Sequence, residues 1–267
     1  MQATINGIRM AYDVSGAETG PPVVLHHSLA MNMSLWDELA AVLAPKYRVI
    51  RFDARGHGQT EASKAPYTFE TLAADVVGLM DHLKIGKAHF VGLSMGGMVG
   101  QFLGVLYPGR FASLTLASTS SRIPPEGRGL WLQRVTDTHE KGIESQVQVA
   151  IPRWVTEANK VAKPEVLARL TKNLLGTPAE GFCGWAGAIA TLDITDRLKT
   201  IAVPTQVIVG EEDPGTPPAA ARVIHNEIAG SSLIVAPKLS HMLCTEEPAI
   251  FNGYVTAFLD KQPAIAA

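Results

Sequence analysis

The sequence predicts an α/β fold in which a mostly parallel, twisted sheet is flanked by helices and carries an inserted helical cap. Two observations lead to this prediction. Short apolar stretches typical of buried strands alternate with helix-like stretches along most of the chain, as in a parallel sheet covered on both faces. This alternation stops at residues 122–199, where helix-like segments follow one another with almost no strand signal. We therefore expect residues 1–121 and 200–267 to form the core and residues 122–199 to form a cap over the strand ends.

The first half of the chain is expected to begin with a hairpin and to continue as strands and helices in turn. Asn6-Gly7 favours a tight type I′ turn between two short strand-like runs. Thr68 is a good N-cap for a helix that continues to about Leu83, with apolar residues every three or four positions and Gly86 as a stop signal. The other expected elements are strands at residues 23–25, 47–52, 88–91, 114–117, 205–209 and 232–235 and helices at residues 36–43, 97–106 and 248–259.

The composition fits one such domain and excludes several classes of protein. Of 267 residues, 46% are hydrophobic and 18% are charged, which is enough apolar material for a large core. The net charge is −2 and no basic cluster stands out, so neither nucleic acid nor a membrane surface is an expected partner. No stretch resembles a secretory signal or a membrane span, which predicts a cytoplasmic protein; the oligomeric state is left open.

The two cysteines, Cys183 and Cys244, have no metal-ligand spacing. Free thiols in a reducing compartment are the simplest interpretation, and a disulfide between them stays open. No metal site is predicted.

The most informative motif is G-x-S-x-G at residues 92–96, between a strand-like and a helix-like stretch. This is the pattern of a nucleophile elbow, a sharp turn that exposes its serine at the end of a strand. Glycines two residues before and after Ser94 remove Cβ atoms that would collide where helix and strand pack closely. The helix N-terminus favours developing negative charge beside the serine. Ser94 is therefore the predicted nucleophile of an acyl-transfer reaction.

A serine nucleophile needs a base and a group that orients the base, in the chain order Ser, Asp or Glu, His. Asp213 follows the strand predicted at residues 205–209 and is the best candidate for the orienting carboxylate; Glu211 and Glu212 are its rivals. His241 follows the last predicted strand through a short loop and is the predicted base.

The oxyanion of the tetrahedral intermediate needs two hydrogen-bond donors. We assign them to the backbone N–H groups of Met95, directly after the nucleophile, and of Leu29, in the loop after the strand at residues 23–25. Among the histidines, His26 and His27 precede this loop and are placed to orient it, and His57 is expected to brace a loop. The structural interpretation is preferred for His82, His89, His139 and His225, which have no partner pattern.

A further set of motifs extends from the first strands to the cap. It comprises Asn32-Met33-Ser34-Leu35-Trp36 after a His-Ser-Leu loop, RFDARGHG at residues 51–58, PYT at 66–68, LMDHLKI at 79–85, GLSMGG at 92–97, IPRW at 151–154 and EGF at 180–182. Through these motifs the chain resembles the α/β-hydrolases over nearly its whole length. Within that superfamily it is most similar to the 3-oxoadipate enol-lactonases.

The resemblance implies a hydrolase that acts on a small ester or lactone without a metal or organic cofactor. Ser94, Asp213 and His241 match the catalytic triad of the family. Arg153 and Trp154 match cap positions that meet the substrate, and a planar guanidinium suits the carboxylate of a charged lactone. Two interpretations stay open for this pair: Arg153 lies on the surface and Trp154 anchors the cap, or both face the pocket.

Three functions remain in competition, because a fold and a triad do not fix a substrate. The first is the opening of a carboxylate-bearing enol-lactone. The second is a general carboxylesterase or a haloperoxidase-like perhydrolase with the same triad. The third is a hydrolase-fold ligand receptor with slow turnover. Dehalogenases and epoxide hydrolases of this fold use an aspartate nucleophile, which Ser94 excludes.

Overall fold

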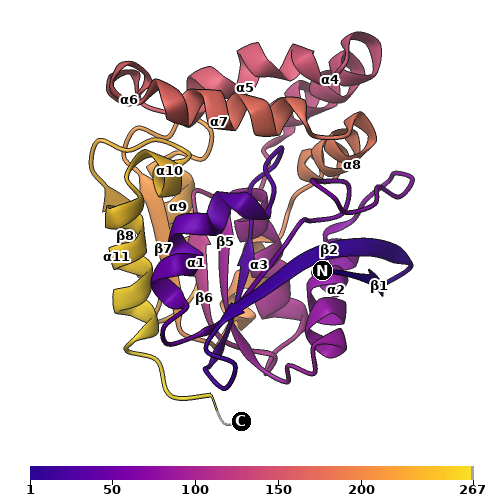
Figure 1. Cartoon of the computed structure of the whole chain (residues 1–267). Helices are drawn as coiled ribbons and strands as arrows, with labels where there is room; N and C mark the ends of the chain where they lie inside the picture. Colours follow the sequence, from indigo (N-terminus) through magenta and orange to yellow (C-terminus); the bar gives the residue numbers. More distant parts are fainter. Residues whose placement is uncertain (266–267) are drawn as a thin grey trace.

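The computed structural model describes residues 1–265 and has a single eight-stranded sheet within them, with strand order β1-β2-β4-β3-β5-β6-β7-β8 (Figure 1). The pairs β1–β2 and β2–β4 are antiparallel and all later pairs are parallel, so the predicted mostly parallel sheet is confirmed. The strands are β1 (Gln2–Ile5), β2 (Ile8–Gly16), β3 (Pro22–His26), β4 (Arg48–Phe52), β5 (Ala88–Leu93), β6 (Phe111–Ala117), β7 (Thr205–Gly210) and β8 (Ser232–Ala236).

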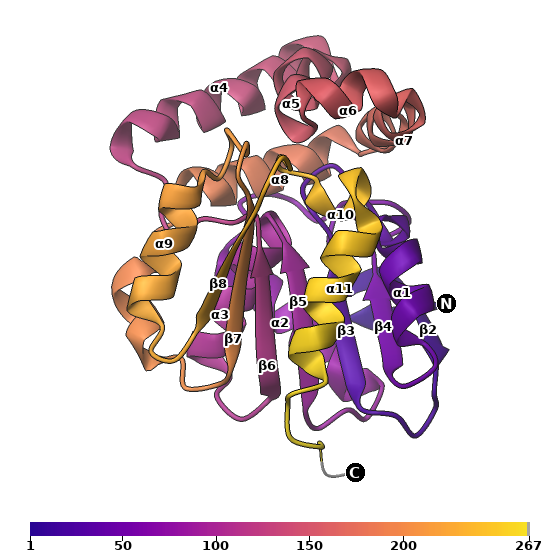
Figure 2. The ribbon, with the colours of Figure 1, turned by 90° about the vertical axis from the view of Figure 1, so that its left-hand side faces the viewer.

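Helices cover both faces of the sheet; in Figure 2 the strands lie side by side, with α1 and α11 in front of them and α2 and α3 behind. Helices α1 and α11 pack together on one face, and α2, α3 and α9 lie on the other. The core helices are α1 (Asp37–Leu43), α2 (Phe69–His82), α3 (Met95–Leu106), α9 (Pro218–Glu227), α10 (Leu243–Glu246) and α11 (Pro248–Leu259), with short 3-10 turns at η1 (Met33–Trp36) and η3 (Thr195–Thr200). Helix α9 was not predicted, and α3 begins two residues earlier than expected, directly after Ser94.

The local signals at the N-terminus act as expected. Asn6 and Gly7 both have positive φ, 45° and 78°, which is the conformation of a type I′ turn between β1 and β2. The hydroxyl oxygen of Thr68 accepts a hydrogen bond from the N–H of Thr71 and caps α2. Both cysteines are free and buried, which decides between the two interpretations of Cys183 and Cys244.

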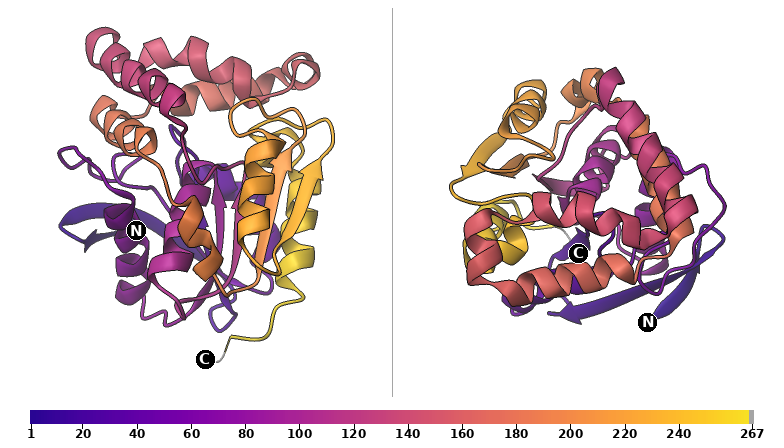
Figure 3. Two further views of the ribbon diagram at one scale, coloured as in Figure 1. Left: turned by 180° about the vertical axis from the view of Figure 1, so that it is seen from behind. Right: turned by 90° about the horizontal axis from the view of Figure 1, so that it is seen from above.

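The middle of the chain is helical and lies above the carboxyl ends of the strands (Figures 1 and 3). We call residues 122–199 the cap, although its exact limits stay a prediction. The helices of this segment are α4 (Pro125–Lys141), α5 (Val147–Trp154), α6 (Glu157–Ala162), α7 (Pro164–Leu175) and α8 (Ala179–Ala190), with a 3-10 turn at η2 (Ile143–Gln146). The two ends of the segment meet where Arg122 pairs with Asp193 in an antiparallel bridge and an ion pair.

No helix in the described part of the chain is long and apolar enough to cross a membrane.

Candidate active site

Ser94 stands at the sharp turn between β5, which is buried along its whole length, and α3. Its backbone has φ 56° and ψ −111°, a strained conformation that the surrounding structure has to hold in place. A Cβ on Gly92 would lie 2.3 Å from the carbonyl oxygen of Gly96, and a Cβ on Gly96 would lie 2.3 Å from that of His26. Both glycines of the motif are therefore required by close backbone contacts, as the sequence predicts.

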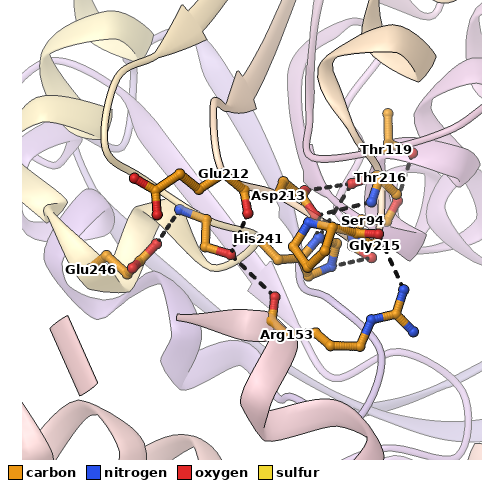
Figure 4. Close-up of polar contacts among 11 residues, drawn as sticks. Ser94, Thr119, Arg153, Glu212, Asp213, Gly215, Thr216, His241 and Glu246 are labelled. Carbon is orange, nitrogen blue, oxygen red and sulfur yellow. Dashed lines mark hydrogen bonds and ion pairs between the residues drawn. The ribbon is translucent and has the colours of Figure 1, made fainter. Parts of the chain in front are cut away.

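Three side chains that are far apart in the sequence form one hydrogen-bonded chain (Figure 4). Ser94 Oγ lies 3.0 Å from His241 Nε2, and His241 Nδ1 lies 2.8 Å from Asp213 Oδ2. The ends of the parallel strands β5, β7 and β8 bring them together. With the Nδ1 proton donated to Asp213, Nε2 is left as the acceptor for the serine hydroxyl.

The carboxylate of Asp213 is held by several donors besides His241. Oδ1 accepts the N–H groups of Gly215 and Thr216 at 2.8 and 3.0 Å, and Oδ2 accepts the Thr216 hydroxyl at 2.6 Å. Burial acts to raise the pKa of this carboxyl, but the attraction of His241 and these hydrogen bonds outweigh it and hold the pKa below its ordinary value. Asp213 is therefore charged at neutral pH. The rivals Glu211 and Glu212 are exposed, and within the described residues neither forms a hydrogen bond or an ion pair with His241.

The expected oxyanion donors lie at the same place. Met95 is the first residue of α3, and Leu29 follows β3 and lines the cavity that Ser94 lines. Neither N–H donates a hydrogen bond to any acceptor within residues 1–265, so both are free for a ligand. The role of Leu29 and Met95 stays a prediction.

Buried histidines brace the loop that carries Leu29. His57 Nε2 accepts the N–H of Ala30 at 3.0 Å, and His27 Nε2 accepts the N–H of Ala54 at 2.9 Å. Burial lowers the pKa of His57 well below 6.5 and also lowers that of His27, so both rings are neutral. In each ring Nδ1 donates to a backbone carbonyl oxygen, and Nε2 is left as the acceptor. The prediction that His57 braces a loop is confirmed, and the loop is the one after β3.

A cavity of about 260 Å³ separates these loops from the cap. Ser94 and His241 line it from below, and Trp154, Arg153 and residues of α4 line it from above. Both interpretations of Trp154 hold, since it is buried in the cap and faces the cavity. Arg153 is an exposed residue that also lines the cavity, and its Nη2 donates to the carbonyl oxygen of Pro214 at 3.2 Å.

Two residues near the site were not found by sequence reasoning. Arg134 of α4 lines the cavity, and its only sequence signal is its position one helical turn after Trp131. Glu246, labelled in Figure 4, is fully buried near His241. Its Oε2 accepts the N–H of Ser240 at 2.6 Å, and its Oε1 accepts that of Thr156 at 2.7 Å. Together with a hydrogen bond from the N–H of Met242 to the carbonyl of Trp154, it ties the loop of His241 to α5.

Within residues 1–265, no group of three or more His, Cys, Asp or Glu side chains is arranged to hold a metal ion.

Comparison with known proteins agrees with this geometry. Residues 21–248 match the family model of the alpha/beta hydrolase fold. Two 3-oxoadipate enol-lactonases of Acinetobacter baylyi are 34% and 30% identical, over 97% and 93% of this chain and 96% and 94% of the relatives. The crystal structure of an enol-lactonase from Burkholderia xenovorans LB400 superimposes with a TM-score of 0.94 at 36% identity, covering 98% of this chain and 100% of the other. The resemblance indicated by the sequence motifs is confirmed.

Proposed function

Because this chain belongs to the alpha/beta hydrolase fold family and is a carboxylic ester hydrolase, we propose that it opens a small, carboxylate-bearing enol-lactone of the 3-oxoadipate enol-lactone type through an acyl-enzyme on Ser94. The observation that carries the proposal is the hydrogen-bonded chain of Ser94, His241 and Asp213 beside two free backbone N–H groups. A nucleophile, an oriented base and an oxyanion site are the parts that acyl transfer requires.

In the first half-reaction, Ser94 Oγ attacks the lactone carbonyl while His241 Nε2 takes the hydroxyl proton. Asp213 holds the imidazole in the required tautomer and stabilises the imidazolium that forms. The N–H groups of Leu29 and Met95 donate to the oxyanion. The intermediate then loses the ring C–O bond, and His241 returns the proton to the departing enol oxygen. An enol is a better leaving group than an ordinary alkoxide, so the ring opens readily.

In the second half-reaction, water attacks the acyl ester as His241 removes its proton. The bond to Ser94 Oγ breaks, the proton returns to the serine, and a carboxylic acid is released. The net change is the addition of one water across the lactone C–O bond. No metal or organic cofactor takes part in this scheme.

The lining of the cavity supports a small anionic substrate. Its volume of about 260 Å³ suits a compact ring with a short side chain. Trp154 offers an apolar wall to the ring, and Arg153 offers a guanidinium to a carboxylate. The three relatives named above, which are 30–36% identical, are enol-lactonases by name, and this supports the same class of substrate.

A general carboxylesterase is the second candidate, because most of the cavity lining is apolar and accepts neutral acyl groups as well. The apolar residues of the lining are Leu29, Met98, Ile123, Pro124, Leu130, Trp131, Val149, Ala150, Trp154 and Ile189.

The replacement Ser94→Ala tests the nucleophile. Removing the hydroxyl should lower kcat/KM for an activated p-nitrophenyl ester by about 10⁴-fold or more, because no other group can form the acyl-enzyme. A fluorophosphonate should add once to the wild-type protein, and mass spectrometry of peptides should place the adduct on Ser94. Ser120→Ala removes a hydroxyl from the same cavity and is the matched control, with an expected loss of less than about tenfold. Wild-type turnover in a folded Ser94→Ala protein would contradict the proposal.

A further inference from the structure

Arg134 of α4 lies in the cavity in a fixed orientation. The carbon of its guanidinium is 4.5 Å from the centre of the Trp131 ring and 5.1 Å from that of Phe182. Its Nε donates to Oε1 of Gln146 at 2.8 Å. Cation–π contacts with two rings and a hydrogen bond at Nε together hold the guanidinium in one position.

The charge of Arg134 has no counter-ion within residues 1–265. No aspartate or glutamate is among the cavity-lining residues of this part of the chain. Burial and the charge of Arg153 lower the pKa of the Arg134 guanidinium to about 10, the direction expected for a half-buried cation without a carboxylate partner. Other arginines of the chain do have carboxylate partners: Arg51, Arg55, Arg110, Arg122 and Arg169.

The two terminal nitrogens of the Arg134 guanidinium have no partner within residues 1–265. Nε is occupied by Gln146, whereas Nη1 and Nη2 donate to no acceptor in the part of the chain that the structure describes. Two adjacent N–H groups of this kind match the two oxygens of a carboxylate. Because the cavity also contains Ser94 and His241, an anion at these two nitrogens would be the far end of a molecule whose carbonyl faces the nucleophile.

We propose that Arg134 binds the carboxylate of the substrate and makes the enzyme selective for small esters and lactones with an anionic acyl chain. This inference rests on the proposed function and assigns the anion to α4 rather than to α5. Arg153 is exposed, and its Nη2 is engaged with Pro214, so water screens its charge and it adds only a weaker attraction.

The experiment compares two activated esters that differ at the end of the acyl chain. They are the mono-p-nitrophenyl ester of adipic acid, which ends in a carboxylate, and p-nitrophenyl hexanoate, which ends in a methyl group. Arg134→Gln should lower the ratio of kcat/KM for the adipate ester over the hexanoate ester on the order of 100-fold, as expected when one partner of a desolvated charge pair is lost. The change should lie mainly in KM.

Two further variants separate charge from shape. Arg134→Lys keeps the charge but not the planar pair of donors, and should recover only part of the ratio. Arg128→Gln makes the same change of charge at an exposed position of α4 that does not line the cavity, and should leave the ratio within about threefold.

The outcomes distinguish this inference from the proposed function. A ratio in Arg134→Gln within threefold of the wild-type ratio would overturn the role of Arg134, even though both esters were still hydrolysed through Ser94. Absence of turnover of both esters by the wild-type protein would instead remove the proposed function. Thermal unfolding checks that each variant folds. If Arg134→Gln does not fold, Arg134→Met, which keeps the apolar stem beside Trp131, is judged by the same ratio.

Discussion

The loops at the strand ends and the helices of the cap line one cavity, but they place their residues by different physical means. In the loops, backbone geometry and hydrogen bonds fix each group: Ser94 has a strained positive φ, and Asp213 accepts four hydrogen bonds. In the cap, the lining side chains stand on helices and depend on packing. Some of them face water, such as Leu130, which is 71% exposed, and Val149, which is 39% exposed.

This difference separates two requirements of an esterase. Proton transfer depends on distances of about 3 Å and tolerates little displacement, so its groups lie in short loops anchored at the ends of the rigid sheet. Recognition of the acyl group needs only a cavity wall of suitable shape and charge. A single substitution on a cap helix can alter that wall without moving the catalytic groups. The hydrogen bonds of Glu246 and Trp154 join the two regions beside His241, so the wall keeps its position relative to the base.

A glycine from each region tests this difference most directly. Gly96→Ala would put a Cβ 2.3 Å from the carbonyl oxygen of His26, so the elbow and β3 must separate. We expect a loss of about 3 kcal/mol in the free energy of unfolding and a fall in kcat on the order of 100-fold. Gly187→Ala in α8 meets nothing within 4 Å and should stabilise the protein by about 0.5–1 kcal/mol. Urea unfolding and ester hydrolysis measure both effects; equal behaviour of the two variants would contradict the distinction.

Acid should weaken the loop region through its buried histidines. The pKa values of His26, His27 and His57 are lower in the folded protein than the ordinary 6.5, so below about pH 6.5 the unfolded chain binds protons that the native state does not. Above that pH the rings are neutral in both states, and their contribution to stability is fully present. The free energy of unfolding should fall as the pH drops from 6.5 toward the lower pKa values of the folded state. The slope approaches about 1.4 kcal/mol per pH unit for each such histidine.

Urea unfolding between pH 7.5 and 5.0 measures this slope in a range where most carboxylates stay ionised. His57→Gln removes one of the buried groups and should reduce the slope. His139→Gln changes an exposed histidine of α4 in the cap and is the matched control. A wild-type free energy of unfolding that stays flat over this range would show that the three rings accept protons in the native state.

More of the loop region than of the cap could be predicted from the sequence, because backbone geometry in the loops restricts which residues can occur there. A positive φ at Ser94 and the close approach of Gly96 to His26 leave only certain residues possible, so the chain carries a readable motif. The sequence only favours Asp213 over Glu211 and Glu212 as the triad carboxylate. The three residues are adjacent, and only the folded structure shows which side chain points toward His241. The strand alternation was equally clear, because buried parallel strands need continuous apolar runs.

The functional residues of the cap give weaker signals in the sequence. Arg134 is an ordinary helical residue in sequence, and its importance comes from Trp131, Phe182 and Gln146, two of which lie well away from it in the chain. Its lack of a counter-ion is a property of the folded neighbourhood alone. Helix α9 gives a weak sequence signal for another reason. It follows prolines at residues 214, 217 and 218, which are typical of turns and loops, although Pro218 occupies the first turn of the helix, where proline is tolerated.

The smallest predicted effect concerns Arg153, the other cationic residue of the cavity. Arg153→Gln should lower kcat/KM for the mono-p-nitrophenyl adipate by less than about tenfold and affect p-nitrophenyl hexanoate still less, because an exposed charge is screened by water and salt. The loss should shrink further in 0.5 M NaCl. A loss as large as that of Arg134→Gln would move the anion toward α5 and the mouth of the cavity. If neither variant loses activity on the adipate ester, neither guanidinium recognises a carboxylate, and the general carboxylesterase becomes the better-supported function.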